Sequence, residues 1–96
     1  MSIGIIVEAK LKPETVEEAK QFFIEIIPDT RNFEGCESVS VFVDEEDPTT
    51  LFLVERWAAK ENYEKYHHWR QENGSLDQLR SFLDGGVKRN FLDIVT

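Results

Sequence analysis

The sequence predicts an α+β fold, in which one four-stranded antiparallel sheet is covered by helices on one face. Four segments carry the apolar patterns of strands, either alternating with polar residues or apolar almost throughout. Between them lie two longer segments with apolar residues at helical spacing. The resulting order, β-α-β-β-α-β with a short additional helix before the last strand, is that of the ferredoxin-like fold.

The first part of the chain supplies a strand and a helix. Apolar and polar residues alternate from Ser2 to Leu11, which predicts a strand with one buried face. A helix is predicted from about Pro13 to Ile27, and we expect Pro28 to end it because proline lacks the N–H that a helix interior requires. The apolar arc of this helix contains Val16, Ala19, Phe22, Phe23, Ile26 and Ile27.

The middle of the chain is predicted to form a hairpin. Glu37 to Asp44 alternates again and is interpreted as the second strand. The acidic turn from Asp44 to Pro48 lacks the glycine and distal glutamate of a calcium loop, so we interpret it as a solvated hairpin loop. Leu51 to Ala58 is the predicted third strand, and it is apolar on both faces.

The remaining segments complete the fold. A second helix is predicted from Lys60 to Gln71, and Gly74 interrupts it. Ser75 and Gln78 have the spacing of a capping box, which predicts a short third helix that ends at Gly85-Gly86. This helix would carry Leu76, Leu79, Phe82 and Leu83, and the last strand would follow from Val87 to Val95.

Length and composition exclude several classes of function. The 96 residues make one domain, 1–96, and their 41% hydrophobic and 31% charged content is that of a globular chain. A net charge of −8 argues against nucleic acid or an anionic membrane as the partner, since both require a basic surface. The chain shows neither a secretion-signal pattern nor an apolar run of bilayer length, so we expect a soluble cytoplasmic protein.

No metal site is predicted. The lone Cys36 can form neither an intrachain disulfide nor a zinc site, and we interpret it as structural. His67 and His68 are adjacent on a helix and therefore point in different directions, so they do not readily share a metal ion. We interpret His68 as a surface residue.

The helices can cover only one face of the predicted sheet. Because Leu51 to Ala58 is apolar on both sides, we expect its other face to be covered as well. A second copy of the chain, packed sheet against sheet, is the simplest cover. The sequence therefore predicts a homodimer.

The stretch from Leu51 to Gly74 contains the candidate site residues, because it combines large aromatic and ionisable side chains. Tyr63, Tyr66 and Arg70 fall on one face of the predicted helix, with Trp69 and His67 on its edges. In one interpretation these rings surround an aromatic ligand, and Arg70 or His67 supplies a polar handle. In the other they form a core stripe, with Arg70 extended to solvent or paired with Glu55. The indole N–H of Trp57 needs an acceptor, and a ligand oxygen is one candidate.

Several short motifs together resemble one family. They are Leu11-Lys12-Pro13, Gly35-Cys36, Asp47-Pro48, Glu55-x-Trp57 and Tyr66-x-x-Trp69-Arg70-x-Glu72-x-Gly74. In their order and spacing the chain resembles the antibiotic biosynthesis monooxygenase (ABM) domain, a dimeric α+β-barrel family that includes quinol monooxygenases. The resemblance implies a homodimer with a pocket between the sheet and the helices of each subunit. Active members oxidise electron-rich phenols or quinols with O₂ and use no cofactor.

The residue pattern of this stretch and the resemblance together give the expected site residues. The expected catalytic residues are Trp57, Tyr66, His67 and Arg70, and the expected substrate-binding residues are Tyr63, Trp69, Leu53 and Glu55. Two positions depart from the family pattern, since Tyr66 replaces a common histidine and Leu53 an asparagine found in some active members. Two alternatives therefore remain beside a monooxygenase: a non-catalytic binder or sensor of a small aromatic molecule, and a haem-binding or haem-degrading protein.

Overall fold

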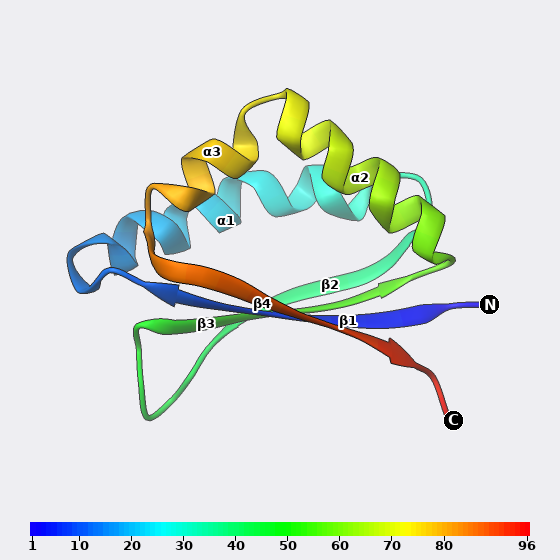
Figure 1. Ribbon diagram of the computed structural model, residues 1–96, viewed down its shortest axis with the longest axis horizontal. Coiled ribbons are helices and arrows are strands. Elements are labelled where there is room, and N and C mark those ends of the chain that lie inside the picture. Colours follow the sequence, from blue (N-terminus) through cyan, green and yellow to red (C-terminus); the bar gives the residue numbers. More distant parts are fainter.

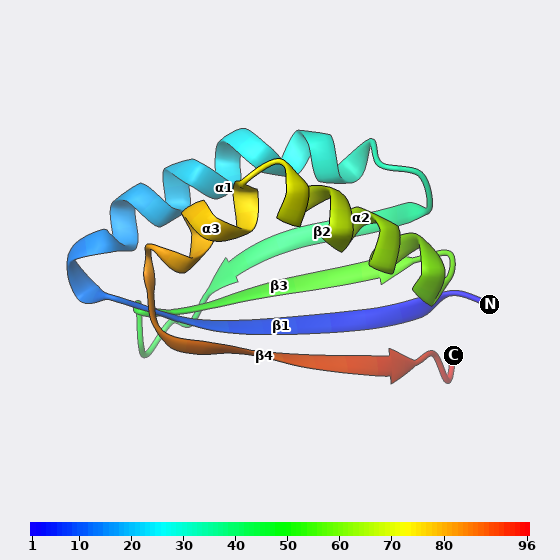
Figure 2. The same ribbon diagram turned by 45° about the horizontal axis from the view of Figure 1, so that its top comes forward.

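The computed structural model describes residues 1–96 and consists of two layers, a twisted sheet and a layer of helices across one of its faces (Figures 1 and 2). The strands are β1 (Ile3–Leu11), β2 (Cys36–Val43), β3 (Thr50–Trp57) and β4 (Leu83–Asp93). The helices are α1 (Val16–Arg31), α2 (Lys60–Glu72) and α3 (Ser75–Arg80), and the short 3-10 helix η1 (Pro13–Thr15) precedes α1. None of the helices is long and apolar enough to cross a bilayer.

The sheet is antiparallel, with strand order β2-β3-β1-β4. The predicted ferredoxin-like arrangement is therefore confirmed, and the predicted ends of β1, β2, β3 and α2 are correct to within one residue. The strand register places Glu55 of β3 and Phe91 of β4 on either side of Ile5. In the next row on the same face, Val7 lies between Leu53 and Arg89.

The hydrophobic core lies between the sheet and the helices. The alternation in β1 is confirmed, because Ile5, Val7, Ala9 and Leu11 are all buried under the helices. One part of the core joins the apolar arc of α1 to β1 and β3. A second, smaller cluster contains Ile5, Val7, Trp57 and Tyr63 and lies under α2.

The opposite face of the sheet is not covered by any element of the chain (Figure 1). It exposes 54% of Phe42, 43% of Val54 and 40% of Leu92. These residues come from β2, β3 and β4, and the strand register places Ile6 of β1 directly beside Val54. Exposed apolar side chains grouped in this way are typical of an interaction surface.

The predicted end of the first helix is wrong, since α1 continues through Pro28 to Arg31. Proline leaves the carbonyl group one turn earlier without its helical donor, and here that carbonyl belongs to Ile24. Ile24 and Pro28 both lie on the exposed side of the helix, so water can satisfy the free carbonyl group.

The predicted capping box is also wrong. Gly74 occupies the N-cap position of α3 with a positive φ of 85°, and Ser75 is already the first helical residue. The helix ends at Arg80 rather than at Gly85-Gly86, and β4 begins at Leu83 rather than at Val87. Pairing between Leu83 and Leu11 extends the sheet here, so strand formation overrides the local helical pattern.

Gly35 allows α2 to lie close to the connection between α1 and β2. Its φ is +90°, and a Cβ atom built there would come within 2.3 Å of Asn62 at the start of α2. We expect Gly35→Ala to lower the free energy of unfolding by about 2–3 kcal/mol, of which roughly 1 kcal/mol reflects the left-handed backbone. Gly74→Ala is the matched control, because its φ is +85° but nothing lies within 4 Å of the added atom. If urea denaturation gave the same loss of unfolding free energy for both variants, the contact with Asn62 would have no energetic cost.

Candidate functional site

A small cavity lies inside the molecule between the sheet and the three helices. Its volume is about 50 Å³, and ten of its fifteen lining residues are hydrophobic. The hydrophobic residues include Tyr63 and Tyr66, and the other five residues are Glu55, His67, Arg70, Ser75 and Arg89. We call it the inner cavity. A space of this size holds water or a hydroxyl group, because a pocket for a drug-sized ligand has a volume of at least about 300 Å³.

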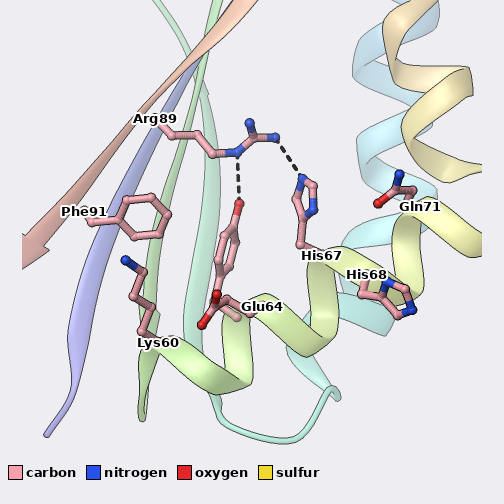
Figure 3. Close-up of a pocket in the computed structure, with 8 residues that line it drawn as sticks. Lys60, Glu64, His67, His68, Gln71, Arg89 and Phe91 are labelled. Atoms are coloured by element: carbon pink, nitrogen blue, oxygen red, sulfur yellow. Dashed lines mark hydrogen bonds between the residues drawn. The ribbon is translucent and has the colours of Figure 1, made fainter.

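A second, open cavity lies between α2 and the edge strand β4 (Figure 3). Its volume is about 390 Å³, and we call it the outer cleft. The residues that line it are Lys60, Tyr63, Glu64, His67, His68, Gln71, Arg89 and Phe91. Its size admits an aromatic ring.

Three side chains form the boundary between these spaces, because Tyr63, His67 and Arg89 line both of them. Arg89 donates from Nε to the Tyr63 hydroxyl at 3.0 Å, and its Nη2 lies 3.3 Å from His67 Nε2 (Figure 3). Since a guanidinium group can only donate, His67 Nε2 is the acceptor. Burial, together with the charges of Arg89 and Arg80, lowers the pKa of His67, which favours this neutral imidazole.

Glu55 lies at the sheet side of the inner cavity and is only 5% exposed. Its Oε1 atom accepts a hydrogen bond of 2.9 Å from Trp57 Nε1. Burial raises the pKa of Glu55, against the smaller opposing effects of the Trp57 bond and the Arg89 charge. The acceptor of the indole N–H is thus a carboxylate of the same strand, not a ligand oxygen.

The two tryptophans line neither space. Trp57 is fully buried, with ring centroids of Tyr66 and Tyr63 at 5.1 and 5.7 Å. Trp69 is 37% exposed and lies over the guanidinium of Arg70, 4.6 Å from ring centroid to Cζ. Both therefore support the residues that line the cavity instead of facing it.

Arg70 is a buried cation that connects the three helices. It is 4% exposed and donates to the Ile26 carbonyl and Thr30 hydroxyl of α1 at 2.9 and 3.0 Å. It also donates to Tyr66 Oη at 2.9 Å and to Ser75 Oγ of α3 at 3.3 Å. All four acceptors are neutral, so the proposed pairing of Arg70 with Glu55 is wrong. Burial raises the pKa of Tyr66, which keeps this phenol neutral beside the cation.

Of the residues predicted for the site, six line the inner cavity: Leu53, Glu55, Tyr63, Tyr66, His67 and Arg70. Sequence reasoning missed Arg89 and Phe91, which enter from β4. The spacing of Val87, Arg89 and Phe91 places them on one face of a strand. Only the pairing of β4 with β1 shows that this face points toward α2.

Cys36 has no reactive character here. Burial, with a smaller contribution from the nearby Glu55 charge, raises the pKa of its thiol to about 11. The group is therefore protonated at neutral pH and is a poor nucleophile.

We expect Arg70→Lys to lower the free energy of unfolding by about 2–4 kcal/mol, because a lysine cannot replace the four hydrogen bonds that join the helices. Arg80→Lys is the control, since Arg80 forms an exposed pair with Asp77 and should change stability by less than about 0.5 kcal/mol. Chemical denaturation of both variants tests this. Equal stabilities would show that Arg70 does not hold the helices together.

Comparison with known proteins agrees with this architecture. No curated protein matches the sequence. The fold is similar to that of a conserved protein from Methanosarcina mazei Go1, with 23% identity over 95% of this chain and 90% of that chain, and a TM-score of 0.87. A structure described as an antibiotic biosynthesis monooxygenase has 18% identity, coverage of 98% and 99%, and a TM-score of 0.89.

A third similar structure is a mutant of SnoaB, a cofactor-independent oxygenase from Streptomyces nogalater. It shares only 6% identity, over 99% of this chain and 94% of that chain, with a TM-score of 0.84. Identities this low establish the fold alone. The family is established by sequence, because the model of the antibiotic biosynthesis monooxygenase family matches residues 2–73. The chain belongs to the antibiotic biosynthesis monooxygenase family.

Proposed function

We propose that the protein is a cofactor-independent monooxygenase that oxidises a small electron-rich hydroxyaromatic, such as a quinol or a polyketide-like phenol, with O₂. The observation that carries this proposal is the convergence of Tyr63, His67 and Arg89 where the outer cleft meets the inner cavity. Ten of the fifteen residues that line the inner cavity are hydrophobic, and apolar walls with a few convergent polar groups are usual for a small-molecule site, whereas six of the eight residues that line the outer cleft are polar or charged. Family membership supports the same kind of reaction.

In such a reaction the substrate supplies all the electrons. A phenol and O₂ give a para-quinone and water, so that one oxygen atom becomes the new carbonyl and the other leaves as water. Loss of the hydroxyl proton raises the electron density on the ring carbon that reduces O₂. The task of the protein is to bind, deprotonate and orient the ring and to exclude bulk water.

The positions of the side chains suggest how they share this task. The ring would lie in the outer cleft against Tyr63 and Phe91, and its hydroxyl group would point toward Arg89. Arg89 forms no ion pair with a carboxylate, so its charge is free to stabilise a phenolate. Tyr66 and His67 would orient the substrate from α2.

The remaining predicted residues would act indirectly. Trp57 donates a hydrogen bond to Glu55, and Arg70 donates one to Tyr66. Trp69 stacks on Arg70 from the outside. In this proposal Trp57, Trp69 and Arg70 position the groups that meet the substrate.

A non-catalytic binder or sensor of an aromatic molecule is the second candidate. The observation that favours it is the volume of the inner cavity, about 50 Å³, which does not admit a ring. A ligand confined to the outer cleft would bind to Tyr63 and Phe91 and leave chemically unchanged.

We also propose that the protein forms a homodimer through the open face of the sheet. The apolar side chains on this face include Ile6, Phe42, Phe52, Val54 and Leu92. A second copy packed against this face would bury them, and the resulting two-sheet core would stabilise a chain of only 96 residues.

Oxygen uptake with a panel of hydroquinones and hydroxynaphthalenes tests the monooxygenase. We expect Arg89→Met to lower kcat/KM by about 100-fold, as loss of a donor to a developing oxyanion does. Lys65→Met removes a charge from the exposed side of α2 and should leave the rate unchanged. If the wild-type protein binds these compounds in thermal-shift assays but returns them unoxidised after incubation in air, the binder is correct and the monooxygenase is not.

Sedimentation velocity at micromolar concentration tests the dimer, whose mass would be twice that of the 11.2 kDa chain. We expect the double variant Phe42→Asp, Val54→Asp to weaken association by at least about 100-fold, because it places charge in an apolar interface. Ile24→Asp is the control, because this residue is 67% exposed on α1, away from the open face. A wild-type protein that sediments as a monomer would contradict the proposal.

A further inference from the structure

We propose that Glu55 is the general base that removes the proton from a hydroxyl group of the aromatic substrate. The inference rests on the proposed function and adds to it the group that starts the reaction. It requires the free hydroxyl group that the proposed substrates carry.

The first argument is the state of the two carboxylate oxygens. Oε1 is held by Trp57 Nε1, whereas no donor in the protein bonds to Oε2. Every side-chain oxygen or nitrogen that is fully enclosed has a hydrogen-bond partner. Oε2 is therefore not fully enclosed, and since Glu55 is only 5% exposed and lines the inner cavity, we infer that Oε2 faces that cavity. One oxygen is thus fixed in place and the other is free to accept a proton.

The second argument is the character of the surrounding groups. Glu55 faces Cys36 from β2 and Arg89 from β4, while α2 contributes Tyr63, Tyr66, His67 and Arg70 to the cavity. The cavity residues of α1 and α3 are apolar, apart from Ser75. Glu55 is therefore the only carboxylate on the wall of the cavity.

The other groups on this wall are poorly suited to accept a proton. The two phenols are neutral, because burial raises the pKa of each, and the same holds for the Cys36 thiol, which lies near Glu55 but does not line the cavity. Burial, together with the charges of Arg89 and Arg80, lowers the pKa of His67, so its imidazole is a weaker base than an exposed one. Burial also raises the pKa of Glu55, which makes its carboxylate a stronger base than an exposed one.

The third argument is the size of the two spaces. The inner cavity of about 50 Å³ holds a hydroxyl group but no ring, and the outer cleft of about 390 Å³ holds a ring. A substrate that spans both must therefore enter with its hydroxyl group first. Arg89 lies at the boundary and is exposed, so its side chain can turn aside from Tyr63 and His67.

The proposed step is a proton transfer. The O–H bond of the substrate breaks, its proton moves to Oε2 of Glu55, and the electron pair of the bond stays on the substrate oxygen. Glu55 becomes a neutral carboxylic acid and the substrate a phenolate, so the charge of the site is unchanged. The phenolate then faces Arg89. When the product forms, Glu55 returns this proton to the oxygen atom that leaves as water, and the second proton of that water is the hydrogen displaced from the ring carbon that becomes the new carbonyl.

The variant Glu55→Gln tests the proposal, since its amide oxygen can still accept from Trp57 while it cannot act as a base. We expect kcat/KM for a hydroxynaphthalene to fall at least about 100-fold, with KM changed by less than about threefold and the acidic limb of the pH profile lost. The O-methyl ether of the same compound should not be oxidised by the wild-type protein. Glu61→Gln, on the exposed side of α2, is the matched control. Equal rates and equal pH profiles in both variants would overturn the assignment.

Trp57→Phe gives a second readout, because it leaves Glu55 in place and removes the bond to Oε1. That bond lowers the pKa of Glu55, so its loss raises this pKa. A higher pKa means that the carboxylate forms only at higher pH, and the acidic limb of the pH profile should move upward. An unmoved limb in an active variant would contradict the role of Glu55.

An anaerobic titration separates this proposal from the oxidation itself. With 4-nitrophenol as the probe, at a pH where the free compound is neutral, the wild-type protein should produce phenolate absorbance on binding and Glu55→Gln should not. If the wild-type protein oxidises no hydroxyaromatic but still gives this difference, the proposed function fails and the base assignment stands. The same spectrum with both proteins, or no phenolate with either, would overturn the assignment.

Discussion

The buried guanidinium group of Arg70 is the interaction on which the upper layer of this molecule depends. Arg70 is only 4% exposed, and its guanidinium group donates to acceptors from α1, α2 and α3. No carboxylate neutralises its charge. A buried charge is costly unless its donors are satisfied, so each of the three helices must stay where it supplies an acceptor. Arg70 therefore holds in place the three helices that cover the inner cavity. Through its bond to Tyr66 it also holds one of the side chains that line the cavity.

Glu55 lies on the sheet side of the same cavity and, unlike Arg70, leaves part of its hydrogen-bonding capacity unused. Arg70 uses its donors in contacts between helices, whereas Glu55 uses only one of its two oxygens, in a contact within its own strand. The first pattern is that of a structural residue and the second that of a residue held ready for a ligand. The contrast explains why two buried ionisable side chains in one cavity receive different roles.

The aromatic side chains explain why the inner cavity is small. Phe33, Trp57, Tyr63 and Tyr66 pack edge to face or tilted against one another and fill the space under α2. The outer cleft opens at β4, an edge strand whose Phe91 is 47% exposed. A substrate would therefore approach past Arg89 and Phe91, between α2 and the edge of the sheet.

The sequence by itself determined the order of the elements, the buried face of β1 and the common face of Tyr63, Tyr66 and Arg70, because burial imprints a local period on the chain. It did not determine the end of α1 or the start of β4, where solvent exposure of Pro28 and pairing of Leu83 override local preference. Tertiary structure alone decided that Arg89 meets Tyr63 and His67 and that Arg70 meets Thr30, contacts that span 22 to 40 residues of sequence. Such contacts depend on strand register and on the way the helices cross the sheet, and neither leaves a periodic signal in the residues that make them.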